Sequence, residues 1–330
     1  MTRMPAPWST AHDLFDAGYT RDLVVTVLRP IARSYFRVRL LGAERLPDHG
    51  PLILAANHSG NAFPYDGILL DATLWERDGC DPRRKIRTVY EPPLSFVWWM
   101  RPFGIDDFWR RGGGVDMTFE NFDHLLARGE RVLYFPEGVP GIGKGFSRRY
   151  QLQPFHTSFV LLAHRHAAPV FPLYILNAEW IHPFGYTLRP IDALMWRVFG
   201  VPFLPLPLGL LAIAVPWIWY LAFPARLIYL VGRPVDVDPL LRAEGLTDGT
   251  TPDHAMLQRV AERVRESMQP ELDALVARFG RSPYDCRSLW RRLRRERASW
   301  WRILPPGWPA SFIRHDRDRH RPPARGWWHA

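Results

Sequence analysis

The chain of 330 residues is 47% hydrophobic, which suffices to bury a full core and excludes an intrinsically disordered protein. Its formal net charge of +10 comes almost wholly from arginine and predicts an anionic partner, either a nucleic acid or a membrane leaflet. Fifteen tryptophans favour the membrane, because Trp is enriched where one end of a side chain is apolar and the other is wet.

The N-terminal part of the chain, residues 1–40, is expected to be a membrane-proximal helical segment. Residues 1–20 lack the apolar core of a signal peptide. Residues 21–40 mix apolar residues with arginine at helical spacing until Pro30 interrupts the pattern. Such a segment either lies on a bilayer or packs on the core of the protein, and the pattern does not choose between the two.

Short apolar runs that recur along residues 41–238 predict strands. The runs lie at 51–56, 85–90, 131–135, 169–176 and 225–232. Helix-like segments separate them, such as 115–129, for which Asp116 is a candidate cap and Gly129 a candidate end. Strands that alternate with helices predict an α/β domain with a largely parallel central sheet flanked by helices.

An uncharged stretch at residues 203–223 predicts a membrane-associating apolar segment. Its length would suffice for a membrane span, since about 20 apolar residues cross the hydrocarbon. Three prolines, Pro205, Pro207 and Pro216, oppose one straight helix. The pattern favours a segment that dips into one leaflet or lines a lipid groove, while a full span and plain core stay open.

Residues 239–330 predict a C-terminal helical region that ends in a basic tail. Residues 253–279 are typical of a pair of helices broken at Pro270. Residues 289–304 interleave arginine with Trp and Leu, as an interfacial amphipathic helix does. A nucleic-acid-binding or merely solvated tail is the alternative. We expect the partners to be anionic membrane lipids and not nucleic acid. The protein is expected at the cytoplasmic face of a membrane, attached as a peripheral or monotopic protein.

Two polar motifs follow predicted strands. N-H-S-G (57–60) is followed by Asp66, and F-P-E-G (135–138) leads into a glycine-rich run that ends with Lys144. That run matches most of a phosphate-binding loop, but Gly145 stands where Ser or Thr would bind magnesium. We therefore do not expect nucleotide hydrolysis.

Four blocks in order carry a resemblance to a known family: N-H-S-G with Asp66, G-G-V-D (113–116), F-P-E-G, and A-P-V-F-P-L (168–173). The set resembles the glycerolipid (lysophospholipid) acyltransferase superfamily over roughly residues 30–235, with a 1-acylglycerol-phosphate acyltransferase-like domain. P-Y-D-G and the K-G-F-S-R-R-Y-Q-L that trails F-P-E-G look most like its monoacylglycerol/diacylglycerol-acyltransferase-like branch.

The resemblance implies transfer of a fatty acyl group to a hydroxyl of a glycerolipid or related lipid alcohol. His58 would be the general base and Asp66 its orienting partner. The donor would be acyl-CoA or acyl carrier protein, without a further cofactor. The candidate substrate-binding residues are Asn57, Ser59, Gly60, Pro136, Glu137, Gly138, Lys144, Arg148 and Arg149. Among them, the backbone N–H groups around Ser59 and Gly60 are candidate oxyanion donors.

Two departures from the family pattern leave alternatives open. Seven residues separate His58 from Asp66, more than the family's commonest spacing, which supports a catalytically inactive membrane- or lipid-binding scaffold as the competing function. The family's phosphate-binding arginines are missing at the matching sites, so Lys144, Arg148 and Arg149 either substitute for them or face lipid headgroups. Glu137 binds the acceptor, as the resemblance implies, or only stabilises a loop.

Other reactive groups are not expected to form a site. No G-x-S-x-G elbow exists for a lipase or thioesterase. The two cysteines, Cys80 and Cys286, have no metal-ligand spacing, and we expect a reducing compartment. His164 and His166 are expected on the surface, and no metal site is predicted. The oligomeric state is left open by the sequence.

Overall fold

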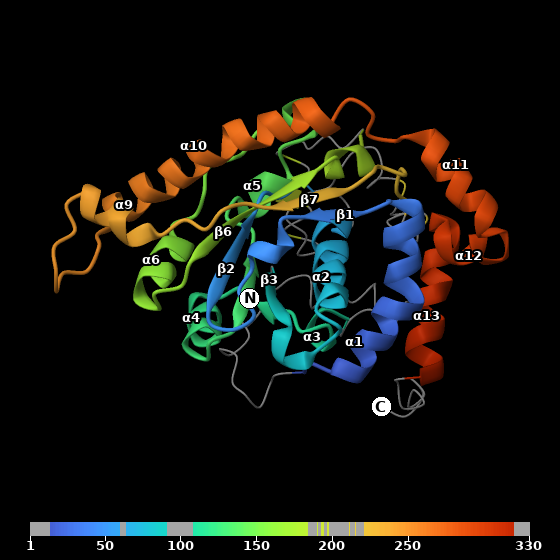
Figure 1. The fold of residues 1–330 in the computed structure, drawn as a ribbon, viewed down its shortest axis with the longest axis horizontal. Helices are drawn as coiled ribbons and strands as arrows, with labels where there is room; N and C mark the ends of the chain where they lie inside the picture. Colours follow the sequence, from blue (N-terminus) through green and yellow to red (C-terminus); the bar gives the residue numbers. More distant parts are fainter. Residues whose placement is uncertain are drawn as a thin grey trace.

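A seven-stranded sheet forms the centre of the protein, as the computed structural model shows (Figure 1). The structure describes residues 14–59, 64–90, 108–183 and 221–319, together with residues 190, 193–194, 197, 211 and 215. The strands are β1 (Arg39–Leu41), β2 (Leu52–Ala56), β3 (Ile86–Tyr90), β4 (Val115–Asp116), β5 (Arg131–Tyr134), β6 (Val170–Leu176) and β7 (Ile228–Val231).

Helices surround the sheet. The α-helices are α1 (Ala17–Leu23), α2 (Tyr65–Arg77), α3 (Phe108–Arg111), α4 (Phe119–Ala127), α5 (Gly138–Ile142), α6 (Ser158–Arg165), α9 (Val237–Ala243), α10 (His254–Phe279), α11 (Cys286–Arg295), α12 (Trp300–Ile303) and α13 (Trp308–Arg319). Shorter or wider helical turns are η2 (Val24–Leu28), η3 (Ile31–Tyr35), η4 (Ala43–Arg45), η5 (Pro82–Arg84), η8 (Phe146–Arg148), η9 (Ala178–Ile181), η11 (Arg297–Ser299) and η12 (Pro305–Gly307).

The strand order is β1-β7-β6-β2-β5-β3-β4, and only the β6–β7 pair is antiparallel among the described strands. All residues of β2 and β6 are buried, as expected for strands covered on both faces. The predicted α/β class with a largely parallel sheet flanked by helices is therefore confirmed. So are the five predicted strands, whereas β1 and β4, with three and two residues, are too short to give a sequence pattern.

Alternate residues of each strand face two separate apolar cores. Leu52 and Leu54 of β2 face a core that includes α1, α2 and the C-terminal helices, whereas Ile53 faces a core that includes α4, α6, α9 and α10. The polar ends of β2 and β5 meet at one edge of the sheet because the two strands are parallel neighbours. That edge carries residues 57–59 and the F-P-E-G motif.

The N-terminal helical segment packs on the first of these cores, which answers the question left open by its pattern. Leu23, Val27 and Ile31 are buried. Pro30 does not end the helical path, because the backbone widens: the N–H of Arg29 bonds to the carbonyl of Val24, five residues earlier.

Two expected helix boundaries are wrong. The helix expected at 115–129 begins later, because residues 115–116 form β4 and the Thr118 hydroxyl, rather than Asp116, caps α4 by accepting the N–H of Asn121. The break expected at Pro270 is absent: α10 runs through it without interruption. Pro270 lies on the exposed side of α10, so solvent can satisfy the carbonyl that loses its partner.

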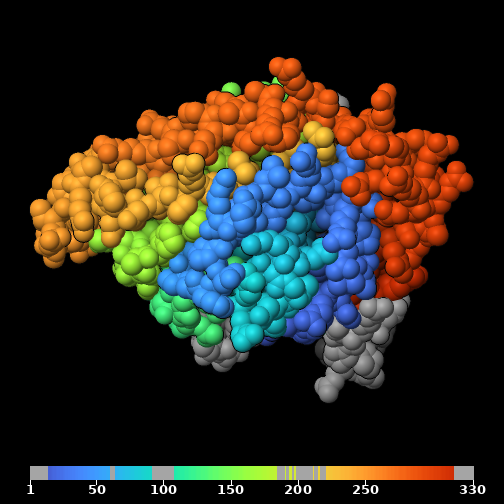
Figure 2. Space-filling view, in the orientation of Figure 1, coloured from blue at the N-terminus to red at the C-terminus, as the bar shows by residue number. Residues whose placement is uncertain are grey.

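The three segments expected as separate regions pack against one another. β1 crosses the expected boundary at residue 40 and pairs with β7, and α10 contacts β6. The C-terminal helices α11 and α12 contact η3, and α13 contacts η2. Figures 1 and 2 show these helices, in orange and red, beside the N-terminal helical segment in blue. Trp308 of α13 is fully buried and its ring meets those of Tyr35 and Phe36.

The apolar stretch 203–223 lies almost wholly outside the described residues, of which it contains only residues 211, 215 and 221–223. Within the described part of the chain, none of the helices combines the length and the apolar character that a membrane crossing requires.

Candidate active site

His58 and Asp66 meet at the carboxyl edge of the sheet. His58 lies two residues after β2 ends, and Asp66 lies in the first turn of α2, which turns the chain back over the sheet. The Nδ1 atom of His58 lies 2.9 Å from Oδ2 of Asp66. The seven-residue interval therefore does not prevent the contact, because the start of α2 returns the carboxylate to the end of β2.

Asp66 is held in its ionised form. Burial opposes ionisation, but the His58 imidazole and the backbone N–H groups of Gly67 and Ser59 outweigh burial and hold the pKa of the Asp66 carboxyl below its ordinary value. Gly67 N–H donates to Oδ1 at 2.9 Å, and Ser59 N–H donates to Oδ2 at 3.2 Å. An ionised Asp66 requires the Nδ1 atom of His58 to carry the proton, which leaves Nε2 as the nitrogen that accepts one.

An apolar cavity begins at His58 and extends along α2. Its empty volume is about 1030 Å3, including space open to solvent. The wall is formed by α1 and η2 on one side and by α2, β3 and α3 on the others, and no arginine or lysine lines it among the described residues. Phe135 forms part of the wall, with its ring centroid 4.3 Å from that of His58. A cavity of this size and character is typical of a site for an apolar ligand.

Glu137 follows β5 and connects the end of that strand to the residues that follow β2. It is fully buried, and its two oxygens accept different backbone N–H groups: Oε1 that of His58 at 2.8 Å and Oε2 that of Gln153 at 2.8 Å. Burial raises the pKa of the Glu137 carboxyl above its ordinary value, although Lys144 and the two N–H groups act against the rise. The contacts favour the interpretation that Glu137 stabilises this loop.

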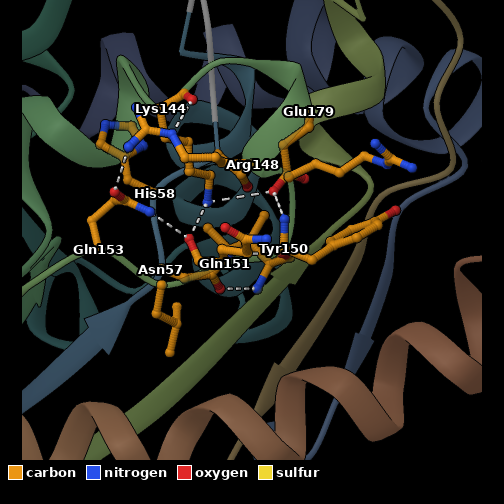
Figure 3. A network of polar contacts seen from close by, with 12 residues as sticks. Asn57, His58, Lys144, Arg148, Tyr150, Gln151, Gln153 and Glu179 are labelled. Carbon is orange, nitrogen blue, oxygen red and sulfur yellow. Dashed lines mark hydrogen bonds and ion pairs between the residues drawn. The ribbon is translucent and has the colours of Figure 1, made fainter.

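Lys144 lies between two buried carboxylates, those of Glu179 and Glu137. Figure 3 shows Lys144 directed toward Glu179. Its Nζ atom lies 3.5 Å from Oε1 of Glu179 and 4.0 Å from Oε2 of Glu137, and it donates to the carbonyl of Gln151 at 3.3 Å. Glu179 in turn accepts the N–H of Tyr150 at 2.9 Å. The ammonium group thus neutralises internal carboxylates and does not line the cavity.

Packing explains one glycine of the run that matches most of a phosphate-binding loop. A Cβ atom at Gly141 would lie 2.6 Å from Cβ of Glu137 and 3.1 Å from Cβ of His58. Only glycine therefore allows α5 to pack against both residues.

The remaining predicted site residues lie away from the cavity, with one exception. Gly138 lines it beside His58. Asn57 is buried and bonds the backbone of Ile175 with both ends of its amide, so it prolongs the β2–β6 pairing by one residue. The Ser59 hydroxyl is buried and has no hydrogen-bond partner among the residues that the structure describes, and its N–H is already bonded to Asp66.

Pro136 is buried and its carbonyl accepts the N–H of His156 at 2.9 Å. Arg148 and Arg149 are exposed. Arg148 Nε donates to the carbonyl of Lys144 at 2.9 Å, while the Arg149 guanidinium lies over the ring of Phe146 at 4.8 Å. Gly60 lies outside the described residues.

Other titratable clusters do not form a site in the described ranges. No group of three or more His, Cys, Asp or Glu residues there is arranged to hold a metal ion. His164 bonds Asp238 at 2.7 Å and His166 bonds Asp123 at 2.9 Å, both as partly exposed pairs between neighbouring elements.

Sequence reasoning missed the cavity wall. Phe135 lines the cavity, although it belongs to the F-P-E-G motif in which only the following residues are candidate site residues. Leu23, Val24 and Leu28 also line it, and they belong to a segment whose location the pattern leaves open. Gly67 and Ile68, one turn apart from Asp71 and Ala72, line the cavity along one face of α2. Their helical spacing is the sequence signal that these four residues share one face of a helix.

Residues 37–176 match the protein-family model described as Acyltransferase. The match shows that this region, less than half of the chain, is similar to that family. Proteins of Mycobacterium tuberculosis (strain H37Rv) and Mycobacterium bovis, both described as uncharacterized, are each 29% identical over 289 residues, which is 83% of this chain and 72% of theirs. A protein of Mycobacterium leprae with the same description is 30% identical over 277 residues, which is 80% of this chain and 66% of its own.

A solved structure of the 1-acyl-sn-glycerophosphate (LPA) acyltransferase PlsC from Thermotoga maritima aligns with a TM-score of 0.44 and 15% sequence identity. The alignment covers 77% of this chain and 80% of that chain.

Proposed function

We propose that this protein is an acyltransferase, which moves a fatty acyl group from a thioester donor, acyl-CoA or acyl carrier protein, to a hydroxyl of a glycerolipid or related lipid alcohol. The observation that carries the proposal is the His58–Asp66 pair, 2.9 Å apart, at one end of an apolar cavity. The cavity offers space for acyl chains, and the imidazole offers a base for the alcohol at that end.

The proposed reaction is a direct transfer. Nε2 of His58 takes the proton of the acceptor hydroxyl as its oxygen attacks the thioester carbonyl. The tetrahedral intermediate then expels the thiolate, which receives the same proton from the imidazolium and leaves as a thiol. Asp66, ionised and bonded to Nδ1, stabilises the imidazolium between these two steps.

A covalent acyl-enzyme is not part of this scheme. Ser59 adjoins the base, but its hydroxyl is buried and its neighbouring N–H is engaged by Asp66. Cys286 is exposed on α11, and Cys80 is buried at the end of α2 that lies away from His58. Mass spectrometry after incubation with the donor alone should show no adduct, and a stoichiometric adduct on Ser59 would overturn the direct mechanism.

We infer further that the acceptor carries no phosphate. No cationic side chain lines the cavity among the described residues, Lys144 is engaged by two internal carboxylates, and the two exposed arginines lie off the cavity wall. This supports a neutral acceptor such as a monoacylglycerol or diacylglycerol, in line with the resemblance to that branch. Turnover with lysophosphatidate but not with monoacylglycerol would contradict the inference.

The decisive experiment measures thiol release by purified protein from acyl-CoA and acyl carrier protein donors with a panel of lipid alcohols. His58→Ala should reduce the rate by about 10² to 10⁴, the usual contribution of a general base, and Asp66→Asn should also reduce it strongly. His164→Ala is the matched control, because it removes a histidine–aspartate contact far from the cavity and should leave the rate unchanged. Circular dichroism verifies the fold of each variant.

An inactive lipid-binding scaffold stays the alternative function. Its main support was the long interval between His58 and Asp66, yet the two side chains are in contact. Retention of full activity by His58→Ala would exclude the mechanism. Lipid binding without turnover by the wild-type protein, across the whole panel of donors and acceptors, would favour the scaffold.

A further inference from the structure

We propose that α11 and α12 form a docking surface for an anionic phospholipid bilayer. The surface, called the Arg/Trp face below, consists of the seven arginines and three tryptophans of residues 287–302. The proposal is independent of the proposed acyl transfer, since none of the residues of this face lines the cavity.

Two aliphatic side chains and the one acidic side chain of residues 287–303 contact the rest of the protein. Leu293 and Ile303 are buried in the core shared with the N-terminal segment. Glu296, the single acidic residue of the stretch 287–302, accepts a hydrogen bond from the hydroxyl of Ser34 on η3 at 2.7 Å. The one acidic group of this stretch is therefore bonded to the N-terminal segment.

The basic and aromatic groups point the other way. The exposed fractions of Trp290, Trp300 and Trp301 are 55%, 36% and 41%. All seven arginines are exposed, and none of them forms an ion pair with a residue in the described part of the chain. A surface that leaves this much positive charge and aromatic area open to water is suited to an anionic, partly apolar partner.

A lipid surface suits these groups better than a nucleic acid does. Arginine beside tryptophan on a helix is the composition of an interfacial helix, with guanidinium groups at the headgroups and indoles at the boundary of the hydrocarbon. Single-stranded nucleic acid would instead stack its bases on aromatic faces. Here Arg294 lies over the Trp290 ring at 5.9 Å, and Arg302 lies over the Trp301 ring at 4.8 Å.

Exposed apolar residues lie near the start of α11. Leu221 and Phe223 have exposed fractions of 44% and 45%. The Phe223 ring lies 6.2 Å from that of Tyr284, which immediately precedes the capping residue of α11. Apolar side chains beside a basic helix are the arrangement expected for partial insertion into a leaflet.

The Arg/Trp face is joined to the cavity through packed helices. α11 and α12 contact η3, α13 contacts η2, and Val24 and Leu28 of η2 line the cavity. A bilayer held on this face would thus orient the N-terminal wall of the cavity relative to the membrane.

Co-sedimentation of the full chain with vesicles tests the proposal. The vesicles are phosphatidylcholine alone, or phosphatidylcholine with phosphatidylglycerol, at low salt. The triple variant Arg291→Gln/Arg292→Gln/Arg294→Gln should bind the anionic vesicles about 100-fold more weakly, since each basic residue near the surface contributes about fivefold. Raising the salt from about 0.1 M to about 1 M should weaken wild-type binding and affect the variant less.

The matched control is Arg83→Gln/Arg128→Gln/Arg259→Gln, which removes the same charge from exposed arginines elsewhere, each paired with a carboxylate. It should retain most of the affinity. Trp290→Ala should weaken binding at both salt concentrations, because its contribution is not screened. His58→Ala should bind as the wild type does, which separates failure of this proposal from failure of the proposed reaction.

Three outcomes would overturn the proposal. Equal binding of the wild type to neutral and anionic vesicles at low salt would remove its electrostatic basis. Equal losses in the triple variant and its control would show that only net charge matters. Tighter binding to a labelled single-stranded oligonucleotide than to anionic vesicles, at the same salt, would assign the Arg/Trp face to nucleic acid instead.

Discussion

Two charged regions of this protein are built in opposite ways. Around Glu137, Lys144 and Glu179 the charges are buried, and each is bonded to a group of the same chain. On the Arg/Trp face the charges are exposed and lack internal carboxylate partners among the described residues. A buried charge costs several kcal/mol to desolvate, so it is tolerated where it fixes a backbone position; an exposed charge costs little and stays available to a partner.

The largest effect is expected for Lys144→Met. Removal of the ammonium group leaves two buried carboxylates without their counter-charge, which should lower the free energy of unfolding by about 3 to 5 kcal/mol. Urea titration measures the change. Arg148→Met, four residues along and exposed, is the control, with an expected change under about 0.5 kcal/mol. Similar losses in the two variants would mean that burial does not distinguish these charges.

The buried imidazole of His182 should make the free energy of unfolding depend on pH. Burial lowers the pKa of the His182 imidazole to about 4, against the opposing effect of its hydrogen bond to the carbonyl of Leu221. The ordinary histidine pKa is about 6.5, so between pH 6.5 and 4 the unfolded state binds more protons and stability falls as pH falls. In His182→Phe, this part of the pH dependence, about 3 kcal/mol across the window, should be missing.

Unfolding free energies of the wild type and His182→Phe at several pH values between about 4 and 7 measure this difference. The unfolding free energy of the wild type minus that of His182→Phe should be constant above pH 7 and decrease as the pH falls toward 4. A constant difference over the whole range would show that His182 does not titrate with a lowered pKa.

Glu137→Gln tests whether Glu137 positions the base or binds the acceptor. An amide in place of the carboxylate directs an NH₂ group toward one of two backbone N–H donors, which should cost about 1 to 3 kcal/mol of stability. If the carboxylate positions His58, kcat should fall about tenfold with little change in KM for the acceptor. A raised KM for the acceptor with unchanged kcat would instead support the acceptor-binding role that the resemblance implies.

The smallest effect on folding is expected for single substitutions on the Arg/Trp face. Arg292→Gln should change the free energy of unfolding by less than about 0.5 kcal/mol, because the side chain is exposed and forms no internal ion pair among the described residues. It should nevertheless weaken binding to anionic vesicles by about fivefold. A loss of stability comparable to that of Lys144→Met would mean that Arg292 stabilises the fold. The exposed arginines would then not differ from the buried charges around Lys144.

The features of this protein that depend on local pattern could be predicted from the sequence. Five apolar runs predicted strands that the structure contains, and their alternation with helical segments predicted the α/β class, because burial on both faces requires continuous apolar strands. The order of four motif blocks placed His58 and Glu137 at strand ends. Parallel neighbours then bring those ends to one edge of the sheet.

The contacts between residues far apart in the chain could not be predicted in this way and became visible only in the folded protein. The contact between His58 and Asp66, the use of both Glu137 oxygens by backbone N–H groups, and the enclosure of Lys144 depend on how the loops at the ends of β2 and β5 cross. The path of α10 through Pro270 depends on which side of that helix faces solvent. Local pattern does not encode such contacts, because their free energy comes from burial and pairing between residues far apart in the chain.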